Sequence, residues 1–184
     1  VVLTNWKGAK EVEAPNHPLR KESTRKITFC DTFFIDRSDF RDVDDNPKYF
    51  GLAPGKTVGL KYSGNITCKS FDRDATSGLV SQINCEVDFD RTVKPKTNIS
   101  WVSTVDAAPV EVRLYSYLLT DDRAAIDPDF MQYIDPNSES VVHGVVEKDV
   151  AHKGVYTTVQ FERFGYFTVD QDTSAGKLVM NRVI

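Results

Sequence analysis

Cysteine is scarce in this sequence, and its placement excludes several kinds of protein. Among 184 residues there are three cysteines, Cys30, Cys68 and Cys85, and no two of them have C-x-x-C spacing. An odd count without paired spacing argues against a disulfide framework and favours free thiols in a reducing compartment. We therefore expect a cytoplasmic protein rather than a secreted one.

Long apolar runs and targeting signals are also missing. No stretch approaches the roughly 20 apolar residues of a membrane-spanning helix. The first residues lack the charged and apolar blocks of a signal peptide, and we interpret residues 1–7 as part of a strand. We expect no membrane partner.

Signatures of catalysis and of nucleotide binding are absent as well. The sequence contains no G-x-G-x-x-G, G-x-x-x-x-G-K-[ST] or G-x-S-x-G motif. His17, His143 and His152 are not spaced like metal ligands, and the aspartates of residues 42–45 and 121–122 do not follow the calcium-loop pattern. We predict that this chain alone catalyses no reaction and holds no metal or cofactor.

Basic residues are outnumbered by acidic ones, 23 against 27, which gives a formal net charge of −4. The imbalance is uneven, because residues 1–70 carry 12 basic and 9 acidic residues and residues 71–184 carry 11 and 18. Non-specific binding of nucleic acid usually needs a strong basic excess. We expect no DNA partner, and any contact with RNA must depend on local basic residues.

Period-two alternation of apolar and polar residues is abundant. It is clearest over residues 57–62, 83–89, 110–115 and 159–162. Such alternation is typical of strands with one buried face. It predicts an all-β fold, and a barrel is the commonest way to remove the edges of its sheets.

Helical signals are few. One short helix is expected after Asp127, because Asp127 can cap it, Pro128 suits its first position, and Pro136 would end it. A weaker helical turn is expected around residues 38–41. We therefore predict one or two short helices in a β-rich chain.

Two segments are candidates for binding. The most basic stretch contains Arg20, Lys21, Arg25 and Lys26, and a solvated loop face explains it equally well. In the second, Gln160 and Glu162 would point to the same side of a strand, where an amide and a carboxylate can recognise the edge of an unstacked base. A plain cross-strand polar pair would have the same pattern.

Five short motifs, in order along nearly the whole chain, carry a family resemblance. They are Asn16-His17-Pro18, Leu52-Ala53-Pro54-Gly55-Lys56, Trp101-Val102-Ser103, Glu111-Val112-Arg113-Leu114-Tyr115, and Gln160-Phe161-Glu162-Arg163 with Gly165-Tyr166-Phe167. With them, the sequence resembles the C-terminal anticodon-binding domain of glutaminyl-tRNA synthetase, a class I aminoacyl-tRNA synthetase. Glutamyl-tRNA synthetases share the architecture but resemble these motifs less.

The resemblance implies two stacked β-barrels, one proximal to and one distal from a catalytic domain that this chain lacks. Residues 1–27 would begin the proximal barrel, residues 28–107 would form the distal barrel, and residues 108–184 would complete the proximal one. The parent protein would be a glutamine–tRNA ligase that uses ATP and magnesium in its upstream catalytic domain. The partners implied are glutamine tRNA and that upstream domain.

The resemblance also implies roles for single residues. Gln160 and Glu162 match the pair that recognises the middle anticodon base, a uridine, and Arg163 matches a residue that supports the same pocket. Lys48 and Lys61 match polar or basic positions near the anticodon, with Lys61 in place of an arginine.

Some positions depart from the pattern of the family. Gly51 and Gly59 stand where arginines are usual, and Leu19 replaces a polar residue. We hypothesise that the basic stretch, Arg20, Lys21, Arg25 and Lys26, supplies the missing charge.

Two alternatives stay open. One is the matching domain of a glutamyl-tRNA synthetase. The other is a secreted β-sandwich with glycans on Asn65 and Asn98, which both match the acceptor pattern. Trp101 follows both Cys68 and Cys85 instead of lying between them, which disfavours the sandwich.

Overall fold

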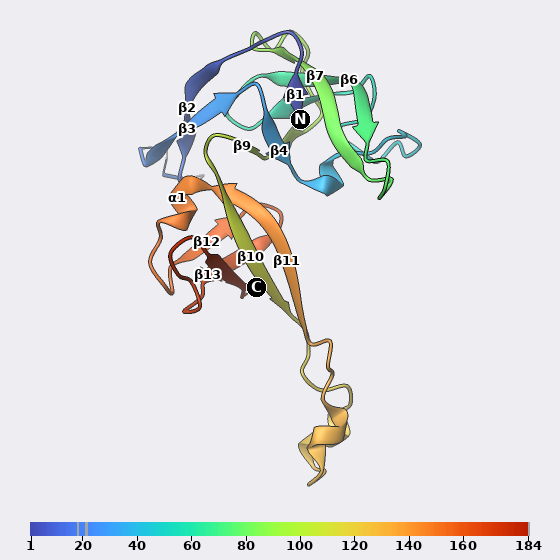
Figure 1. The fold of residues 1–184 in the computed structure, drawn as a ribbon, viewed down its shortest axis with the longest axis vertical. Coiled ribbons are helices and arrows are strands. Elements are labelled where there is room, and N and C mark those ends of the chain that lie inside the picture. The colour runs from blue at the N-terminus through green and yellow to red at the C-terminus, as the bar shows by residue number, and fades with distance from the viewer. Residues whose placement is uncertain (18, 21, 184) are drawn as a thin grey trace. The chain divides into compact units, whose positions relative to one another are not determined.

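The computed structural model describes residues 1–17, 19–20 and 22–183, and strands dominate it (Figure 1). The strands of the first half are β1 (Val2–Leu3), β2 (Ala9–Pro15), β3 (Thr24–Cys30), β4 (Phe33–Ile35), β5 (Thr57–Leu60), β6 (Asn65–Arg73), β7 (Val80–Asp88), β8 (Asn98–Ile99) and β9 (Trp101–Ser103). They are followed by β10 (Ala107–Tyr115), β11 (Glu139–Glu147), β12 (Thr158–Phe161), β13 (Gly165–Val169) and β14 (Leu178–Arg182). The prediction of an all-β fold is confirmed.

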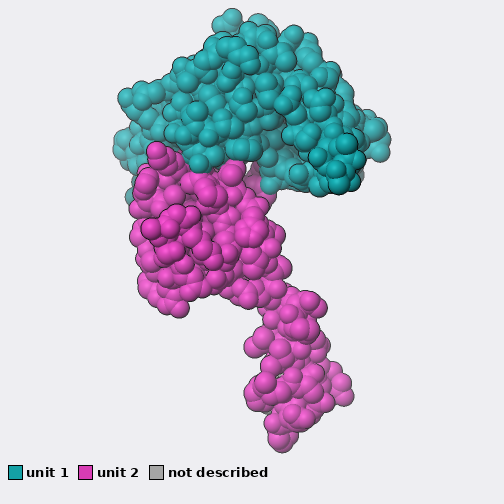
Figure 2. Space-filling view, viewed as in Figure 1, with its two compact units in different colours: residues 1–107 teal, residues 108–184 magenta. Residues whose placement is uncertain are grey.

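The chain divides into two compact units, residues 1–107 and residues 108–184 (Figure 2). In the first unit a five-stranded sheet has the order β1-β7-β6-β5-β8, and two further pairs are β2-β3 and β4-β9. The pairs β1–β7 and β5–β8 are parallel, while β2–β3, β4–β9, β5–β6 and β6–β7 are antiparallel.

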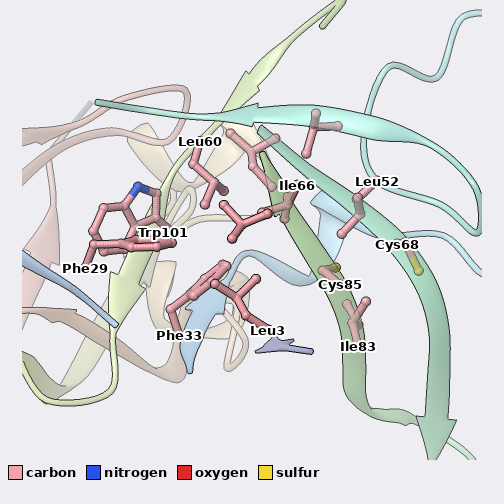
Figure 3. Close-up of a cluster of buried hydrophobic side chains, with 13 residues drawn as sticks. Leu3, Phe29, Phe33, Leu52, Leu60, Ile66, Cys68, Ile83, Cys85 and Trp101 are labelled. Atoms are coloured by element: carbon pink, nitrogen blue, oxygen red, sulfur yellow. The ribbon is translucent and has the colours of Figure 1, made fainter. Parts of the chain in front are cut away.

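The core of the first unit is apolar and rich in aromatic rings (Figure 3). The ring of Phe29 lies 5.1 Å from that of Trp101 and 5.6 Å from that of Phe33. Cys68 and Cys85 are opposite each other on β6 and β7 and are buried, and all three cysteines are free thiols, as the sequence predicts. Burial of this apolar surface is the main force that holds the unit together.

The second unit is built on one five-stranded sheet with the order β11-β10-β14-β13-β12. Its β10 and β14 are parallel, and β12–β13 and β13–β14 are antiparallel. One face of this sheet is covered by its own core, whose buried members are Val110, Val146, Phe167, Val169, Leu178 and Met180. Along β10, Glu111 and Arg113 alternate with residues of this core and point to the other face.

Helical structure is shorter than the sequence indicates. The helix expected after Asp127 is only a 3₁₀ turn, η3 (Phe130–Tyr133), and its N-cap is Asp129. The Asp127 carboxylate accepts bonds from the Asp129 amide (2.9 Å) and the Tyr133 hydroxyl (2.8 Å). Phe130 and Met131 are exposed, so no core stabilises a longer helix there.

Two other 3₁₀ turns and one helical turn complete the list of elements. The turn expected near residues 38–41 is η1 (Arg37–Asp39), which the Asp36 carboxylate caps. The sequence analysis did not predict η2 (Asp122–Ala125) or α1 (Lys148–Ala151). Among the described residues, no helix is long and apolar enough to cross a membrane.

Residues 1–27 pair within the first unit. Strand β1 adds to the sheet beside β7, and β2 forms a hairpin with β3. The assignment of residues 1–27 to a proximal barrel shared with residues 108–184 stays a prediction, as does the closure of the sheets into barrels. Ala107 and Ala108 are the positions at which the two units meet along the chain.

Asn65 cannot serve as a glycan acceptor in this fold. Its side chain is completely buried, and its amide nitrogen donates to the Val93 carbonyl at 2.6 Å. A glycan needs an exposed acceptor amide. This burial removes one of the two sites on which the secreted β-sandwich alternative depends.

Candidate nucleic-acid interface

The β12–β13 hairpin brings three of the predicted site residues together. Strand β12 ends at Phe161, and its carbonyl accepts the Phe164 amide at 2.9 Å, so Glu162 and Arg163 lie in the tight turn. Arg163 has a φ of 73° and Gly165 a φ of 120°, the left-handed geometry that closes a short hairpin. Both Glu162 and Arg163 are exposed at the tip.

Gln160 points away from the core, as the alternation predicts. Its neighbours Val159 and Phe161 pack against the core of the second unit, while Gln160 is exposed. Its direct partner on β13 is Tyr166, whose ring is 43% exposed on the same face. The hairpin therefore presents an amide, an aromatic ring, a carboxylate and a guanidinium within a few residues of one another.

Next to this hairpin, the outer face of the sheet is fixed by ion pairs. Arg113 of β10 contacts Asp172 at 2.7 Å and Glu111 at 3.2 Å, and Lys177 contacts Glu111 at 3.0 Å. The hydrogen bond from Lys177 is the main reason why the pKa of Glu111 is lowered. The hydrogen bond to Asp172 raises the pKa of Arg113. The Arg113 guanidinium is therefore paired with carboxylates and stabilises the sheet.

Asn181 links that ion-pair network to the hairpin. On β14 it lies opposite Arg113 on one side and opposite Thr168 on the other. The Thr168 hydroxyl in turn lies 2.8 Å from that of Thr158 on β12. This row of polar residues crosses four strands on the same face as Gln160 and Tyr166.

In the first unit, hydrogen bonds of its backbone amide and carbonyl fix the position of Lys61. It follows β5, its amide donates to the Ile99 carbonyl at 3.1 Å, and its carbonyl accepts the indole N–H of Trp101 at 2.9 Å. Lys48 lies in an exposed turn, where its amide donates to the Asn46 side chain at 2.9 Å. Both lysines belong to the first unit, whereas the β12–β13 hairpin belongs to the second.

The two glycines that depart from the family pattern are enclosed by neighbours. A Cβ on Gly51 would overlap the ring of Tyr49 and lie 2.8 Å from the Asp39 carbonyl oxygen. A Cβ on Gly59 would overlap the Asn98 side chain and lie 3.1 Å from Pro95 Cγ. The space for a Cβ at either position is already occupied in this structure.

Of the basic stretch, Arg25 and Lys26 lie on β3, and Arg20 lies in the segment between β2 and β3. Lys26 pairs with Glu11 at 2.9 Å, and the bond to that carboxylate raises the pKa of Lys26. Arg25 donates to the Pro15 carbonyl at 2.9 Å. Arg20 is exposed in the loop, and Lys21, like Pro18 of the Asn16-His17-Pro18 motif, lies outside the described residues. Two of the four basic residues are thus already engaged within the hairpin.

Two residues that the sequence analysis did not select stand out in the first unit. The ring of Phe50 is 49% exposed, and the Lys96 ammonium lies 5.8 Å from its centroid. The two residues lie far apart in the sequence, so no local motif predicts that they meet. The one sequence feature that points to this pair is the short basic segment Lys94-Pro95-Lys96.

A cavity of about 380 Å³ also lies in the first unit, lined in part by Phe34, Arg37, Arg41 and Arg73. None of the predicted site residues lines it. Arg73 is paired with Asp42, and Arg41 lies over the ring of Tyr49 at 4.3 Å. Two of its three arginines are therefore engaged within the unit.

Comparison with known families finds two adjacent matches. Residues 1–88 and residues 98–170 each match a family described as "tRNA synthetases class I (E and Q), anti-codon binding domain". Together the matches include β1 to β7 and the whole β12–β13 hairpin.

Comparison with curated proteins finds similar chains over the full length. The sequence is 41% identical over 191 residues to a "Probable glutamine--tRNA ligase" of Dictyostelium discoideum, covering 100% of this chain and 24% of that protein. It is 37% identical over 182 residues to the "Glutamine--tRNA ligase" of Nitrosomonas europaea, covering 93% of this chain and 32% of that protein. The chain thus spans about a quarter to a third of these relatives.

Proposed function

The chain belongs to the anticodon-binding domains of the class I tRNA synthetases for glutamate and glutamine, and on that premise we propose that it binds the anticodon loop of glutamine tRNA. The names of its relatives favour glutamine over glutamate. The observation that carries the proposal is the β12–β13 hairpin, which presents Gln160, Glu162, Arg163 and Tyr166 together.

The chemistry of the hairpin suits a uridine. A uracil edge offers one N–H donor between two carbonyl acceptors. The Glu162 carboxylate can accept from that N–H, and the Gln160 amide can donate to a neighbouring carbonyl. Cytosine lacks the N–H at this position, so a carboxylate placed there would face an acceptor. The Arg163 guanidinium suits an adjacent phosphate.

Lys48 and Lys61 would contact the loop from the first unit, and Arg20, Lys21, Arg25 and Lys26 would contact the RNA backbone. Since Lys26 and Arg25 are engaged within their hairpin, we expect Arg20 to contribute more than either of them. Isolated charge contacts of this kind act on affinity and salt dependence more than on sequence preference.

The rest of the reaction belongs to the parent protein. We propose that this chain is part of a cytoplasmic glutamine–tRNA ligase, whose upstream catalytic domain binds ATP with magnesium, glutamine and the acceptor end of the tRNA. The role of the present chain is recognition, which brings the correct tRNA to that domain. Its division into proximal and distal barrels, with residues 1–27 and 108–184 in the proximal one, is part of the same proposal.

The proposal is tested by binding of the 184-residue chain to glutamine tRNA carrying single base changes. Replacing the middle anticodon uridine by cytidine should weaken binding at least about tenfold, because a charged hydrogen bond contributes about 1.5–3 kcal/mol. Equal affinity for both RNAs would contradict recognition by Gln160 and Glu162.

A second RNA separates glutamine from glutamate specificity. The two anticodon sets share the middle uridine and differ in the third base, guanosine for glutamine and cytidine for glutamate. Replacing that guanosine by cytidine should weaken binding if the domain serves glutamine tRNA. Tighter binding to the changed RNA would instead assign the chain to a glutamate enzyme.

A further inference from the structure

Phe50 is an exposed ring with a loosely held cation above it. Lys96 lies 5.8 Å from the ring centroid, near the outer limit for an attraction between an ammonium and an aromatic face. No other ring of the described residues packs against Phe50, and Lys96 has no ion pair among them. Neither side chain is needed to fill the core of the first unit.

A second lysine–phenylalanine pair in the same unit has a structural role and serves as a comparison. Lys10 lies 3.3 Å from the centroid of Phe89, and desolvation lowers the pKa of Lys10. Phe89 itself packs edge-on against Trp6 and Phe29. Phe89 is thus tied to the aromatic core by two ring contacts, whereas Phe50 has none among the described residues and is more exposed, 49% against 36%.

The backbone around β5 positions Lys96. The Gly59 amide donates to the Thr97 carbonyl at 2.9 Å, so the loop that carries Lys96 packs directly on β5. The absence of a side chain at Gly59 is what lets Pro95 and Asn98 approach so closely. Gly51 follows Phe50 and is enclosed by Tyr49, which limits the positions the Phe50 backbone can take.

The charge around the pair favours an anionic ligand. Lys48 and Lys94, each two residues away from a member of the pair, are exposed and have no ion pair within the described part of the chain. An exposed aromatic ring flanked by free lysines is the combination that binds single-stranded nucleic acid, because the ring stacks on a base and the cations meet phosphates.

We propose that Phe50 and Lys96 form a nucleotide-binding site for one unpaired nucleotide of the tRNA, with its base stacked on Phe50 and its phosphate bound by Lys96. Lys48 and Lys94 add electrostatic attraction. This inference rests on the proposed function and adds a contact that is independent of the β12–β13 hairpin.

The test measures binding of the 184-residue chain to glutamine tRNA as a function of salt, for Phe50→Leu, Phe50→Tyr and Lys96→Gln. Phe50→Leu should weaken binding about 5- to 150-fold, the range for loss of one stacked base, while Phe50→Tyr keeps the ring and should bind normally. Lys96→Gln should reduce the slope of log affinity against log salt by about 0.7.

Matched control variants distinguish the loss of this binding site from a general loss of structure. Phe34 is 45% exposed in the same unit, and Lys69 is an exposed lysine that pairs with Glu86. Phe34→Leu and Lys69→Gln should leave affinity and salt slope unchanged. If they weaken binding as much as the test variants do, or if Phe50→Leu and Lys96→Gln have no effect, the site is overturned.

The same experiment distinguishes the two proposals. If the unsubstituted chain discriminates the middle uridine while Phe50→Leu and Lys96→Gln bind normally, anticodon recognition stands and only the Phe50–Lys96 site is wrong. If the unsubstituted chain fails to bind glutamine tRNA at all, both proposals are wrong.

Discussion

Gln160 on β12 and Tyr166 on β13 are direct cross-strand partners on the sheet face that points away from the core. Side chains at opposed positions lie about 4.5–5.5 Å apart at Cβ, so the amide and the ring can contact the same small ligand. The turn that follows Gln160 places Glu162 and Arg163 beside them. The hairpin is thus one structural unit with four chemically different groups.

Tyr166 should matter for its ring and not for its hydroxyl. Tyr166→Phe is expected to bind glutamine tRNA normally, whereas Tyr166→Ala should weaken binding about 5- to 150-fold through lost stacking. Tyr156→Ala is the control, because Tyr156 is an exposed tyrosine of the same unit outside this hairpin. Equal losses in Tyr166→Ala and Tyr156→Ala would argue against a specific role. Fluorescence anisotropy with labelled tRNA measures each dissociation constant.

Glu162 should control base preference. Glu162→Gln replaces an acceptor-only carboxylate with an amide that can also donate, so the penalty for cytidine at the middle anticodon position should shrink. The measured quantity is the ratio of affinities for the uridine and cytidine RNAs, which a merely structural role would leave unchanged. If the ratio equals that of the unsubstituted chain, Glu162 contributes to the structure of the turn and not to recognition of the base.

Gly59 should tolerate no side chain. In Gly59→Ala the new methyl group would overlap the Asn98 side chain, which must turn away, and would press on Pro95, which must shift by a few tenths of an ångström. Such overpacking usually costs about 1–3 kcal/mol in the free energy of unfolding, and displacement of Lys96 should also weaken RNA binding. Gly154→Ala is the matched control, because its nearest neighbour is Thr157 Oγ1 at 4.0 Å. Urea unfolding of both variants measures the difference.

Much of the fold followed from local patterns in the sequence. The alternation over residues 57–62, 83–89, 110–115 and 159–162 predicted β5, β7, β10 and β12, because each strand buries one face in a core. The helix after Asp127 was overestimated, since its apolar residues have no core to pack against. Capping and proline signals describe where a helix can begin, but burial decides its length.

The candidate site was predictable only in part. Gln160, Glu162 and Arg163 are close in sequence, so a motif could single them out. Phe50 and Lys96 meet only in the folded chain, and the space around Gly51 and Gly59 depends on Tyr49 and on the loop before β8. Contacts between distant segments leave no local pattern, which is why the sequence analysis treated the two glycines simply as missing arginines.

Arg113 should stabilise the second unit in a pH-dependent way. Hydrogen bonds and ion pairs lower the pKa of Glu111, and backbone and side-chain hydrogen bonds together with Arg113 lower that of Asp170. A carboxyl with a lowered folded-state pKa stabilises the fold fully above its unfolded value, near 4.5 for Glu111, and that contribution is lost as pH falls toward the folded value.

Arg113→Met should therefore be most destabilising at neutral pH, and the difference from the unsubstituted chain should shrink below about pH 4. Urea unfolding at pH 7, 5 and 3 measures it. Lys153→Met is the control, because Lys153 forms a more exposed pair with Asp149 in the same unit. A difference that is constant with pH would mean that Arg113 contributes through packing of its aliphatic part alone.

The three buried thiols should react in a fixed order. Burial raises the pKa of the Cys85 thiol to about 12 and also raises that of Cys68, so neither forms a thiolate near neutral pH. Burial acts in the same direction on Cys30, but hydrogen bonds with Ser103 and Thr104 outweigh it and lower the pKa of Cys30. Because the thiolate is the reactive form, Cys30 should be modified first by a disulfide reagent at pH 8. In the native chain, we expect Cys30→Ser to abolish the fast phase, and urea should expose the remaining thiols together. Modification of Cys68 or Cys85 at the rate of Cys30 would show that β6 and β7 open without global unfolding.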